Sequence, residues 1–414
     1  MKNLSFAVAC GRALVLSVAV FIPAFAQDAA QETITQPATA PAPTCAGIST
    51  GAHGSLNGFR PFPATSPWNT EISTAKVDPN SDSLISFIGK STPLHPDFGA
   101  GEYDGSNLGI PYIVVDSSQP LEKVTYVDYG DESDPGPMPI PADAPIEGHP
   151  ADGGDRHVLV IDKSTCWLYE LWSSNPQSNG SWDAGSGAVW DLINGGHRPW
   201  GWTSADAAGL PIFPGLVRYD EVAAGAIKHA IRFTLPSTRA AFVYPASHWA
   251  ATGSTIPMGM RMRLKANFDI SGFSKVNKVI LTALKEYGMI LADNGSGIYI
   301  SGDNDPRWSN DDLHNLTQVQ GSDFEVVQMD EIYTKAPTGA APVIHSFKAK
   351  ESASGKTAEL TWAVNGATYL ILDPAPGPVR GTSVAVAPTK TTTYTLVATG
   401  PYGRATESLT VTVK

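Results

Sequence analysis

The chain has 414 residues, with 28 Lys and Arg against 40 Asp and Glu, which gives a formal net charge of -12 at pH 7. Apolar residues make up 42% and charged residues 16%, so the chain can bury a sizeable core, which argues against wholesale disorder. The acidic balance also argues against a non-specific nucleic-acid binder, which needs a basic face that displaces counterions from phosphates.

Residues 1–26 have the pattern of a secretory signal peptide. Lys2 and Arg12 accompany a short apolar run over residues 13–22, and a small-x-small cleavage site ends at Ala26. The apolar run is too short to span a bilayer, which takes about 20 residues. We therefore expect cleavage after Ala26 and a secreted or periplasmic protein with no transmembrane segment.

Composition divides the rest of the chain into four segments. These are an Ala/Thr/Pro/Gln linker over residues 27–44, a main β-rich domain over 45–334, a second linker over 335–342 and a small domain over 343–414. Export leaves Cys45 and Cys166 in the mature chain, where they form one disulfide or remain two free thiols. There is no C-x-x-C pair, which excludes a zinc ribbon and a thioredoxin-like site.

The main domain is predicted to be mostly β. Hairpins are expected over residues 156–162 with 167–172 and over 289–292 with 297–301, with further strands at 110–115, 229–234, 241–244 and 258–265. Apolar residues at helical spacing over 276–287 predict one helix, which Gly288 ends. Many strands and one or two helices favour a β-sandwich or jelly roll. Through the sequence SPWNT at 66–70, the segment 59–115 resembles a group of secreted bacterial proteins without an assigned activity.

The C-terminal segment alternates apolar and polar residues with period two over 358–364, 393–398 and 408–413, which predicts strands. On Trp362 and the TTYTL sequence at 392–396, residues 341–414 resemble the immunoglobulin-like modules appended to many secreted bacterial enzymes. The resemblance implies a small β-sandwich and no activity of its own.

Tryptophan is the strongest compositional feature of the main domain. Six tryptophans fall within residues 167–202, half of them in stretches rich in Gly, Ser and Asn. Flat rings on loops suit stacking on the apolar face of a sugar, although tryptophans also commonly roof a core. Trp182, Trp200 and Trp202 are the candidates for substrate binding.

Several carboxylates are candidates for catalysis. Glu170 lies in an apolar and aromatic strand, where its charge must be paired or its pKa raised, and a carboxyl with a raised pKa is what a glycosidase uses as its general acid. Asp191, Asp206 and Asp220 are candidates for the second carboxylate. The alternative is structural: an arginine partner for Glu170, and a loop or helix-cap role for Asp206.

Arginines on two predicted strands are candidates for binding an acidic substrate. Arg261 and Arg263 share one face of the strand at 258–265, and Arg232 faces away from the apolar residues that flank it. If the two strands are neighbours, the arginines form a patch that suits a carboxylate or sulfate, and internal ion pairs are the alternative.

Histidines permit a different chemistry. His157, His229 or His248 could act as the base of a lyase that removes the proton beside a uronate carboxylate. His149, Asp152, Asp155 and His157 offer mixed nitrogen and oxygen ligands, but acids beside glycine commonly form turns, so we predict no metal and no cofactor. Loop acids at residues 128–134 and 303–312 fit no calcium loop pattern.

Three functions remain open. The leading hypothesis is a secreted glycoside hydrolase that cleaves a polysaccharide or oligosaccharide, with Glu170 as acid and Asp206 or Asp191 as nucleophile or base. The alternatives are a polysaccharide lyase on a uronate polymer and a non-catalytic glycan-binding protein of the cell surface. There is no G-x-S-x-G elbow, no phosphate-binding loop and no dinucleotide fingerprint, which argues against serine esterases and nucleotide enzymes.

Overall fold

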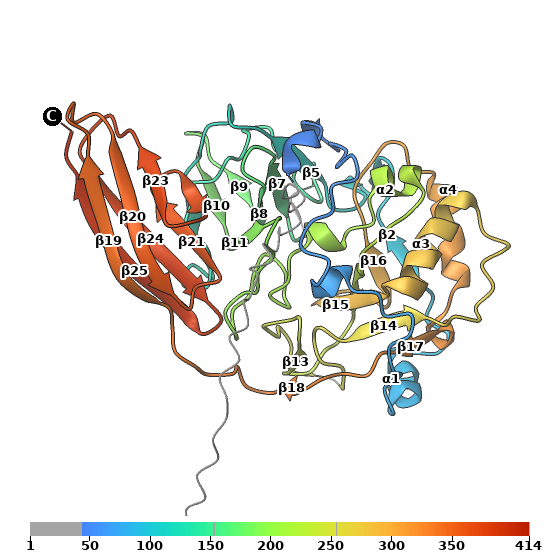
Figure 1. Ribbon diagram of the computed structural model, residues 1–414. Helices are drawn as coiled ribbons and strands as arrows, with labels where there is room; N and C mark the ends of the chain where they lie inside the picture. The colour runs from blue at the N-terminus through green and yellow to red at the C-terminus, as the bar shows by residue number, and fades with distance from the viewer. Residues whose placement is uncertain (1–43, 152–153, 254, 414) are drawn as a thin grey trace, which may run out of the picture. The chain divides into compact units, whose positions relative to one another are not determined.

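The structure is a computed structural model that describes residues 44–151, 154–253 and 255–413. In these ranges the chain is mostly β, with strands in several sheets and four α-helices of 5 to 12 residues (Figure 1). The predicted mostly β class is confirmed. No helix in the described ranges is long and apolar enough to cross a membrane. The signal peptide predicted over 1–26 and nearly all of the linker predicted over 27–44 lie outside the described residues.

A five-stranded mixed sheet carries the first predicted hairpin. Its strands, in spatial order, are β1 (Gly51–Ala52), β5 (Tyr112–Val115), β7 (Val158–Asp162), β8 (Trp167–Trp172) and β11 (Ser186–Asp191). β7 and β8 are antiparallel neighbours with Val160 opposite Tyr169, so the predicted hairpin is confirmed. β7 is buried along its whole length, which explains why its sequence is a continuous apolar run instead of an alternation.

A six-stranded mixed sheet carries the predicted helix. Its order is β17 (Phe324–Val326), β14 (Arg261–Leu264), β15 (Met289–Asn294), β12 (Ile231–Leu235), β16 (Tyr299–Ser301) and β2 (His95–Asp97). The helix α3 (Lys275–Glu286) connects β14 to β15 and is capped by Ser274, whose Oγ accepts a hydrogen bond from the Asn277 N–H at 3.1 Å. It ends before Gly288, which has a φ of 66°, as the sequence predicts.

The second predicted hairpin is wrong. β15 and β16 are close in sequence, but β12 lies between them and pairs with both, in parallel with β15 and antiparallel with β16. The residues Asn294-Gly295, which have the composition of a hairpin turn, instead belong to a connection that passes the intervening strand β12. As a consequence Asp293, near the end of β15, lies beside β12 and its arginine.

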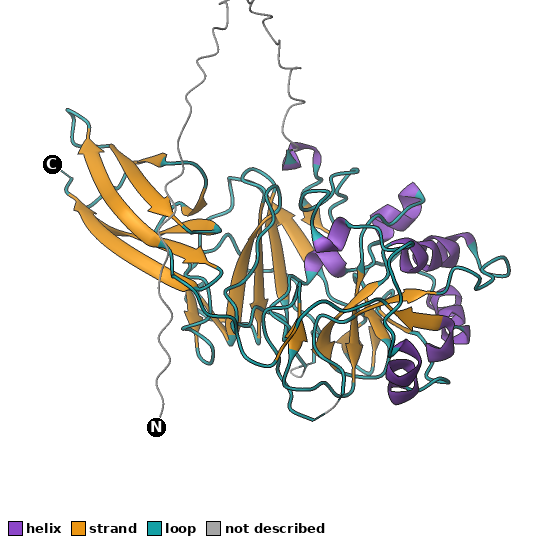
Figure 2. Cartoon of the chain, turned by 60° about the horizontal axis from the view of Figure 1, so that its bottom comes forward, coloured by secondary structure: helices purple, strands orange, loops and turns teal. Residues whose placement is uncertain are grey.

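The other elements of the main region are short. α1 (Ser81–Ile88) contacts β17, while α2 (Tyr219–Ala224) and α4 (Asn310–His314) contact α3, so the helices lie beside the six-stranded sheet (Figure 2). Short strands complete three small sheets: β6 (Val124–Tyr126) with β10 (Trp182–Ala184) and β9 (Asn175–Pro176), β3 (Glu102–Tyr103) with β4 (Ser106–Asn107), and β13 (Phe242–Val243) with β18 (Ile332–Tyr333).

The C-terminal residues form two sheets that share one apolar core. The first contains β19 (Val343–Glu351), β20 (Ala358–Asn365) and β23 (Ser383–Val386), and the second contains β22 (Gly377–Val379), β21 (Tyr369–Asp373), β24 (Thr392–Gly400) and β25 (Gly403–Val411). Trp362 from the first sheet and Leu396 from the second are both buried in that core. The strands predicted by alternation are therefore present, and we call residues 343–413 the C-terminal module.

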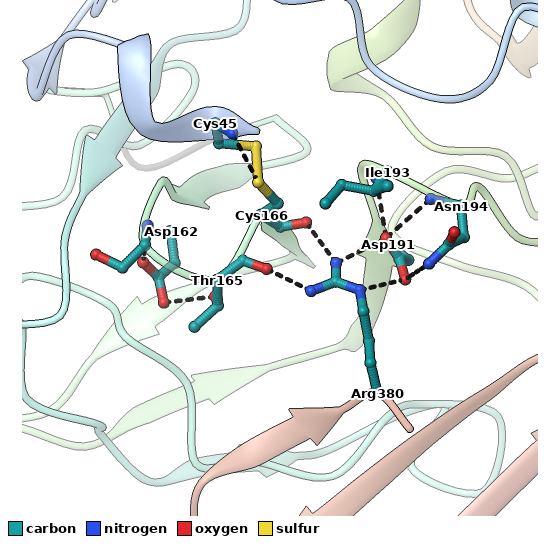
Figure 3. The surroundings of a disulfide bond; sticks show 9 residues. Cys45, Asp162, Thr165, Cys166, Asp191, Ile193, Asn194 and Arg380 are labelled. Atoms are coloured by element: carbon teal, nitrogen blue, oxygen red, sulfur yellow. Dashed lines mark hydrogen bonds and ion pairs between the residues drawn. A yellow bond between two sulfur atoms is a disulfide. The ribbon is translucent and has the colours of Figure 1, made fainter. Parts of the chain in front are cut away.

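Cys45 and Cys166 form a disulfide with their Cα atoms 5.4 Å apart (Figure 3). Cys45 begins the short 3-10 helix η1 (Cys45–Gly47), and Cys166 lies in the turn between β7 and β8. The bond ties the start of the described chain to the five-stranded sheet. Of the two alternatives, one disulfide or two free thiols, the structure therefore has the disulfide.

Reduction of this disulfide is expected to lower the free energy of unfolding by about 2–5 kcal/mol, because the cross-link restricts the unfolded chain over a separation of 121 residues. The measurement is urea unfolding with and without a reductant. The Cys45→Ser/Cys166→Ser double variant is the control, and reductant should not change its stability further. Equal stability of the oxidised and reduced wild type would contradict the expectation.

Candidate functional site

A pocket of about 350 Å³ brings aromatic rings and carboxylates together from distant parts of the chain. The rings are Tyr129, Trp172 and Trp249, and the carboxylates are Asp155, Asp206 and Asp293; Ser186, the segment 203–207, His248 and Ala250 complete the lining. We call this the acidic aromatic pocket. Concave sites that combine apolar rings with a few converging polar groups are the usual binding sites of small ligands.

A larger hollow of about 770 Å³ lies beside α3 and has a different character. Lys228, Lys275 and Lys278 line it, and Tyr287 is the one aromatic ring among its lining residues. It therefore lacks the combination of several rings with several carboxylates that makes the acidic aromatic pocket the candidate site.

Asp206 and Arg232 form a buried ion pair in the wall of the acidic aromatic pocket. Arg232 Nε and Nη2 donate to the two oxygens of Asp206, each at 2.8 Å, and Arg232 Nη1 donates to Ser301 Oγ at 2.7 Å. Such a two-pronged contact fixes both side chains. The prediction that Arg232 faces away from the apolar face of its strand is confirmed.

Asp293 lies against the same guanidinium but is less buried. Its Oδ2 is 3.2 Å from Arg232 Nη2, and its side chain is 19% exposed against 0% for Asp206. Burial, followed by the negative charge of Asp206, raises the pKa of Asp293 to about 7, and the charge of Arg232 offsets only part of this rise. Near neutral pH Asp293 is therefore a carboxyl that can either donate or accept a proton.

His157 lies behind the pocket with both ring nitrogens engaged. Its Nδ1 contacts Glu147 Oε2, and its Nε2 is 2.9 Å from the carbonyl oxygen of Ala205. Burial alone would lower the pKa of His157, but the charge and hydrogen bond of Glu147 outweigh it and raise this pKa to about 9. At neutral pH the ring is a buried cation that holds the pocket wall, which does not suit the base of a lyase.

Glu147, Asp155 and His157 each have one potential ligand atom within 4.8 Å of the others. A histidine ligand must be neutral with a nitrogen lone pair free, whereas His157 donates through both nitrogens. We therefore assign no ion to this group. Asp155 is exposed, and its Oδ1 accepts a hydrogen bond from Trp172 Nε1 at 3.2 Å, which places this carboxylate beside a pocket ring.

Glu170 is fully buried in β8, away from the pocket lining. Its carboxylate accepts hydrogen bonds from the N–H groups of Ile212 and Phe213 and from Trp190 Nε1, at 2.8–3.1 Å. Burial raises the pKa of Glu170 to about 7, although these donors act in the opposite direction. The sequence predicts the raised pKa correctly, but the contacts are those of a structural anchor between β8 and the segment that follows residue 211.

Glu170 is expected to make stability depend on pH. Its folded pKa of about 7 exceeds its ordinary value of 4.5, so its contribution is fully present below pH 4.5 and is lost as the pH rises to about 7. Glu170→Gln should remove this fall, which is about 3 kcal/mol, from unfolding free energies measured by urea at several pH values. Glu359→Gln, at an exposed position of β20, is the matched control. Parallel pH curves for wild type and Glu170→Gln would show that Glu170 titrates normally.

Asp191 and Asp220 also lie outside the acidic aromatic pocket. Arg380 of the C-terminal module binds both oxygens of Asp191 at 2.7 Å, next to the disulfide (Figure 3). Asp220 Oδ2 accepts a hydrogen bond from the Leu56 N–H at 2.8 Å. Both aspartates therefore join segments that are distant in the sequence, and neither faces the rings that would hold a sugar.

The three tryptophans predicted to bind sugar are not among the pocket lining. Trp182 is 1% exposed in β10, so no face of its ring is free. Trp200 stacks on Phe242 with ring centroids 5.6 Å apart, and the guanidinium of Arg404 lies 4.7 Å from the ring of Trp202. The pocket instead uses Trp172, which is one of the six clustered tryptophans, and Trp249, which is not.

The predicted arginine patch is not formed. β15 lies between β12 and β14, so Arg232 is separated from Arg261 and Arg263 by a strand. Arg261 donates to the carbonyl oxygens of Pro67 and Tyr287, at 3.0 and 2.8 Å, and Arg263 binds Glu325 at 2.7 Å. The internal ion pairs that the sequence left as the alternative are present for Arg232 and Arg263, whereas Arg261 is held by backbone carbonyl oxygens.

Of the candidates proposed from the sequence, the structure brings Asp206 and Arg232 together at the pocket, places His248 in its lining and places His157 behind it. The sequence reasoning missed Asp293 and considered Asp155 only as a possible metal ligand, because Gly154-Asp155 and Asp293-Asn294-Gly295 have the composition of turns. Comparisons with known proteins do not identify the site: no family model, no curated protein and no solved structure matches the chain.

Proposed function

We propose that the protein is a secreted glycoside hydrolase whose active site is the acidic aromatic pocket. The observation that carries the proposal is the convergence of three carboxylates and three aromatic rings in one cavity. Indole and phenol rings offer flat faces for a sugar, and a pair of carboxyl groups with different pKa values is what glycoside hydrolysis needs.

In this proposal Asp293 is the general acid. A carboxyl group with a pKa of about 7 is largely protonated in mildly acidic solution and can give its proton to the leaving glycosidic oxygen. The resulting carboxylate remains next to the guanidinium of Arg232, which stabilises the negative charge at 3.2 Å. Asp206 acts through Arg232 and is therefore a positioning residue, because its own oxygens are committed to that ion pair.

Asp155 is the proposed second carboxylate. It is exposed in the pocket and tied to Trp172 by one hydrogen bond, so it can approach a sugar that lies on that ring. There it would stabilise the positive charge that develops on the sugar, as a nucleophile or as a base that activates water; the separation of the two carboxyl groups in the bound state decides between these outcomes.

Two features of the sequence complete the proposal. Export rests on the signal peptide predicted over residues 1–26. The C-terminal module, with seven strands in two sheets over one core, supports an immunoglobulin-like assignment. For the main domain, a sandwich or jelly-roll arrangement stays a prediction, and its helix-covered six-stranded sheet departs from that pattern.

The test is a screen of the mature chain, residues 27–414, against neutral, basic and acidic polysaccharides, with new reducing ends and ultraviolet absorbance followed together. New reducing ends without absorbance would support the hydrolase. Absorbance of unsaturated uronates would overturn it in favour of a lyase, which the pocket does not favour, since neither lysine nor arginine is among its described lining residues. Binding without any turnover would favour the glycan-binding alternative.

A further inference from the structure

The acidic aromatic pocket lies in a strongly negative environment. Besides the three carboxylates of its lining, two further acids, Glu147 and Asp97, interact with the charges of the site. Burial, followed by the negative charge of Glu147, raises the pKa of Asp97, and the charge of Glu147 also raises the pKa of Arg232. At pH 6 Asp293, with a pKa of about 7, is largely protonated. Of the other acids, Asp206 contacts the cation Arg232, Glu147 contacts the cation His157, and Asp155 contacts the Trp172 ring nitrogen.

Both cations are already committed to partners. Arg232 donates to Asp206, Asp293 and Ser301, and His157 is bonded to Glu147 and the backbone of Ala205. A ligand that enters the pocket therefore meets the carboxylate of Asp155, which lines it. A uronate or sulfated sugar would bring a further negative charge to Asp155, and like charges in a partly desolvated site repel each other strongly.

The aromatic rings add to the preference for a cation. Trp172 and Tyr129 have their ring centroids 6.1 Å apart at an angle of 51°, and Trp249 contributes a third ring to the lining. The faces of such rings attract an ammonium group, and the three N–H donors of that group can bond to carboxylates. The same rings accept the apolar face of a sugar, so the pocket suits a ligand that is both a sugar and a cation.

We propose that the acidic aromatic pocket binds an amino sugar unit with a free amine, such as unacetylated glucosamine in a polysaccharide. The inference rests on the proposed function for its choice of a sugar. It adds that the amine is placed against Asp155 and the neighbouring carboxylates, that acetylation of this amine removes the attraction, and that uronate polymers are rejected.

The test measures affinity separately from turnover. Quenching of tryptophan fluorescence in the mature chain, followed at low temperature and pH 6, gives the Kd for hexamers of glucosamine, N-acetylglucosamine, glucose and galacturonate. We expect the glucosamine hexamer to bind about tenfold more tightly than the glucose or acetylated hexamer, and this advantage to shrink with added salt. Galacturonate should bind most weakly.

Two Asp→Asn variants assign the effect to the pocket. Asp155→Asn should remove most of the preference for glucosamine while leaving the affinity for the glucose hexamer near that of the wild type. Asp143→Asn removes the same charge from an exposed position outside the pocket and should leave the preference intact. Equal affinities for the four hexamers, no binding of the glucosamine hexamer, tighter binding of galacturonate, or a preference that survives Asp155→Asn would each overturn the inference.

The outcomes separate this inference from the proposed hydrolase. Preferential binding of the glucosamine hexamer without new reducing ends supports the ligand class and removes the catalytic proposal. Hydrolysis of neutral or acidic polymers with no preference for the amine supports the hydrolase and removes the ligand class. A cationic peptide such as hexalysine serves as a further arm, and its binding at the affinity of the glucosamine hexamer would overturn the assignment of a sugar.

Discussion

Replacing Asp293 by asparagine is expected to reduce kcat for a hydrolysed glycan by about 10²–10⁴-fold, because asparagine has no acidic proton to give to the leaving group. KM for an uncharged substrate should change little, since the rings that would hold the sugar remain. The variant is close to the wild type in shape and keeps an oxygen that can accept the Arg232 contact at 3.2 Å. Steady-state kinetics on the polymer identified by the screen provides the measurement.

The pH profile distinguishes a proton donor from a merely structural aspartate. The general acid must be protonated, so the activity of the wild type should fall as the pH rises through about 7, the pKa of Asp293. The residual activity of Asp293→Asn should lack this alkaline limb. Wild-type turnover in this variant, or an unchanged alkaline limb, would refute the role of Asp293.

Asp206→Asn tests the positioning role in the same experiment. The negative charge of Asp206 helps to raise the pKa of Asp293, and its removal also releases Arg232 to interact more strongly with Asp293. Both changes lower this pKa, so the alkaline limb should move to lower pH. Asp143→Asn is the matched control and should leave both kcat and the profile unchanged.

The strands and the helix could be predicted because their signals are local. Period-two alternation over 358–364 and helical spacing over 276–287 describe one element at a time, and the structure has β20 and α3 there. Pairing is not local. Residues 289–292 and 297–301 read as a hairpin, but β12, which comes more than fifty residues earlier, lies between the two strands.

The same distinction explains the site. A charge in an apolar strand implies a raised pKa, and Glu170 has one. Its partners, Trp190, Ile212 and Phe213, lie 20 to 43 residues away and make it an anchor. Asp293 carries no comparable signal in its own segment. Its pKa depends on burial and on Asp206, whose loop reaches β15 through the hydrogen bond from the Ala208 N–H to the carbonyl oxygen of Ala292 at 2.9 Å.

A second large effect is expected where the C-terminal module meets the main domain. Arg198 and Asp134 are both fully buried, with Arg198 Nη1 at 2.5 Å from Asp134 Oδ2 and 2.6 Å from the hydroxyl oxygen of Tyr369 in β21. The hydroxyl of Tyr369 in turn donates to Asp134 Oδ1 at 2.8 Å. Three segments that are distant in the sequence thus share one closed network of charged and polar groups.

Arg198→Met is expected to lower the free energy of unfolding by about 3–5 kcal/mol, because it leaves the carboxylate of Asp134 buried without its main cation. Arg404 lies 3.6 Å from Asp134 and compensates only in part. Tyr369→Phe removes one hydroxyl from the same network and should cost less, about 1–3 kcal/mol. Urea unfolding followed by tryptophan fluorescence measures both losses.

The double variant Arg198→Met/Asp134→Leu distinguishes the contribution of the ion pair to the free energy of unfolding from the cost of leaving one buried charge unpaired. With both charges gone, no buried carboxylate is left unpaired, so the double variant should be more stable than Arg198→Met alone. A double variant that loses the sum of the two single losses would show that the residues act independently.

The network also connects to the candidate site, since Arg198 Nε donates to the carbonyl oxygen of Thr203, the first residue of the pocket segment 203–207, at 3.2 Å. Arg198→Met should therefore impair turnover under conditions in which the chain is still folded, whereas an unchanged kcat would show that the pocket wall is held without Arg198.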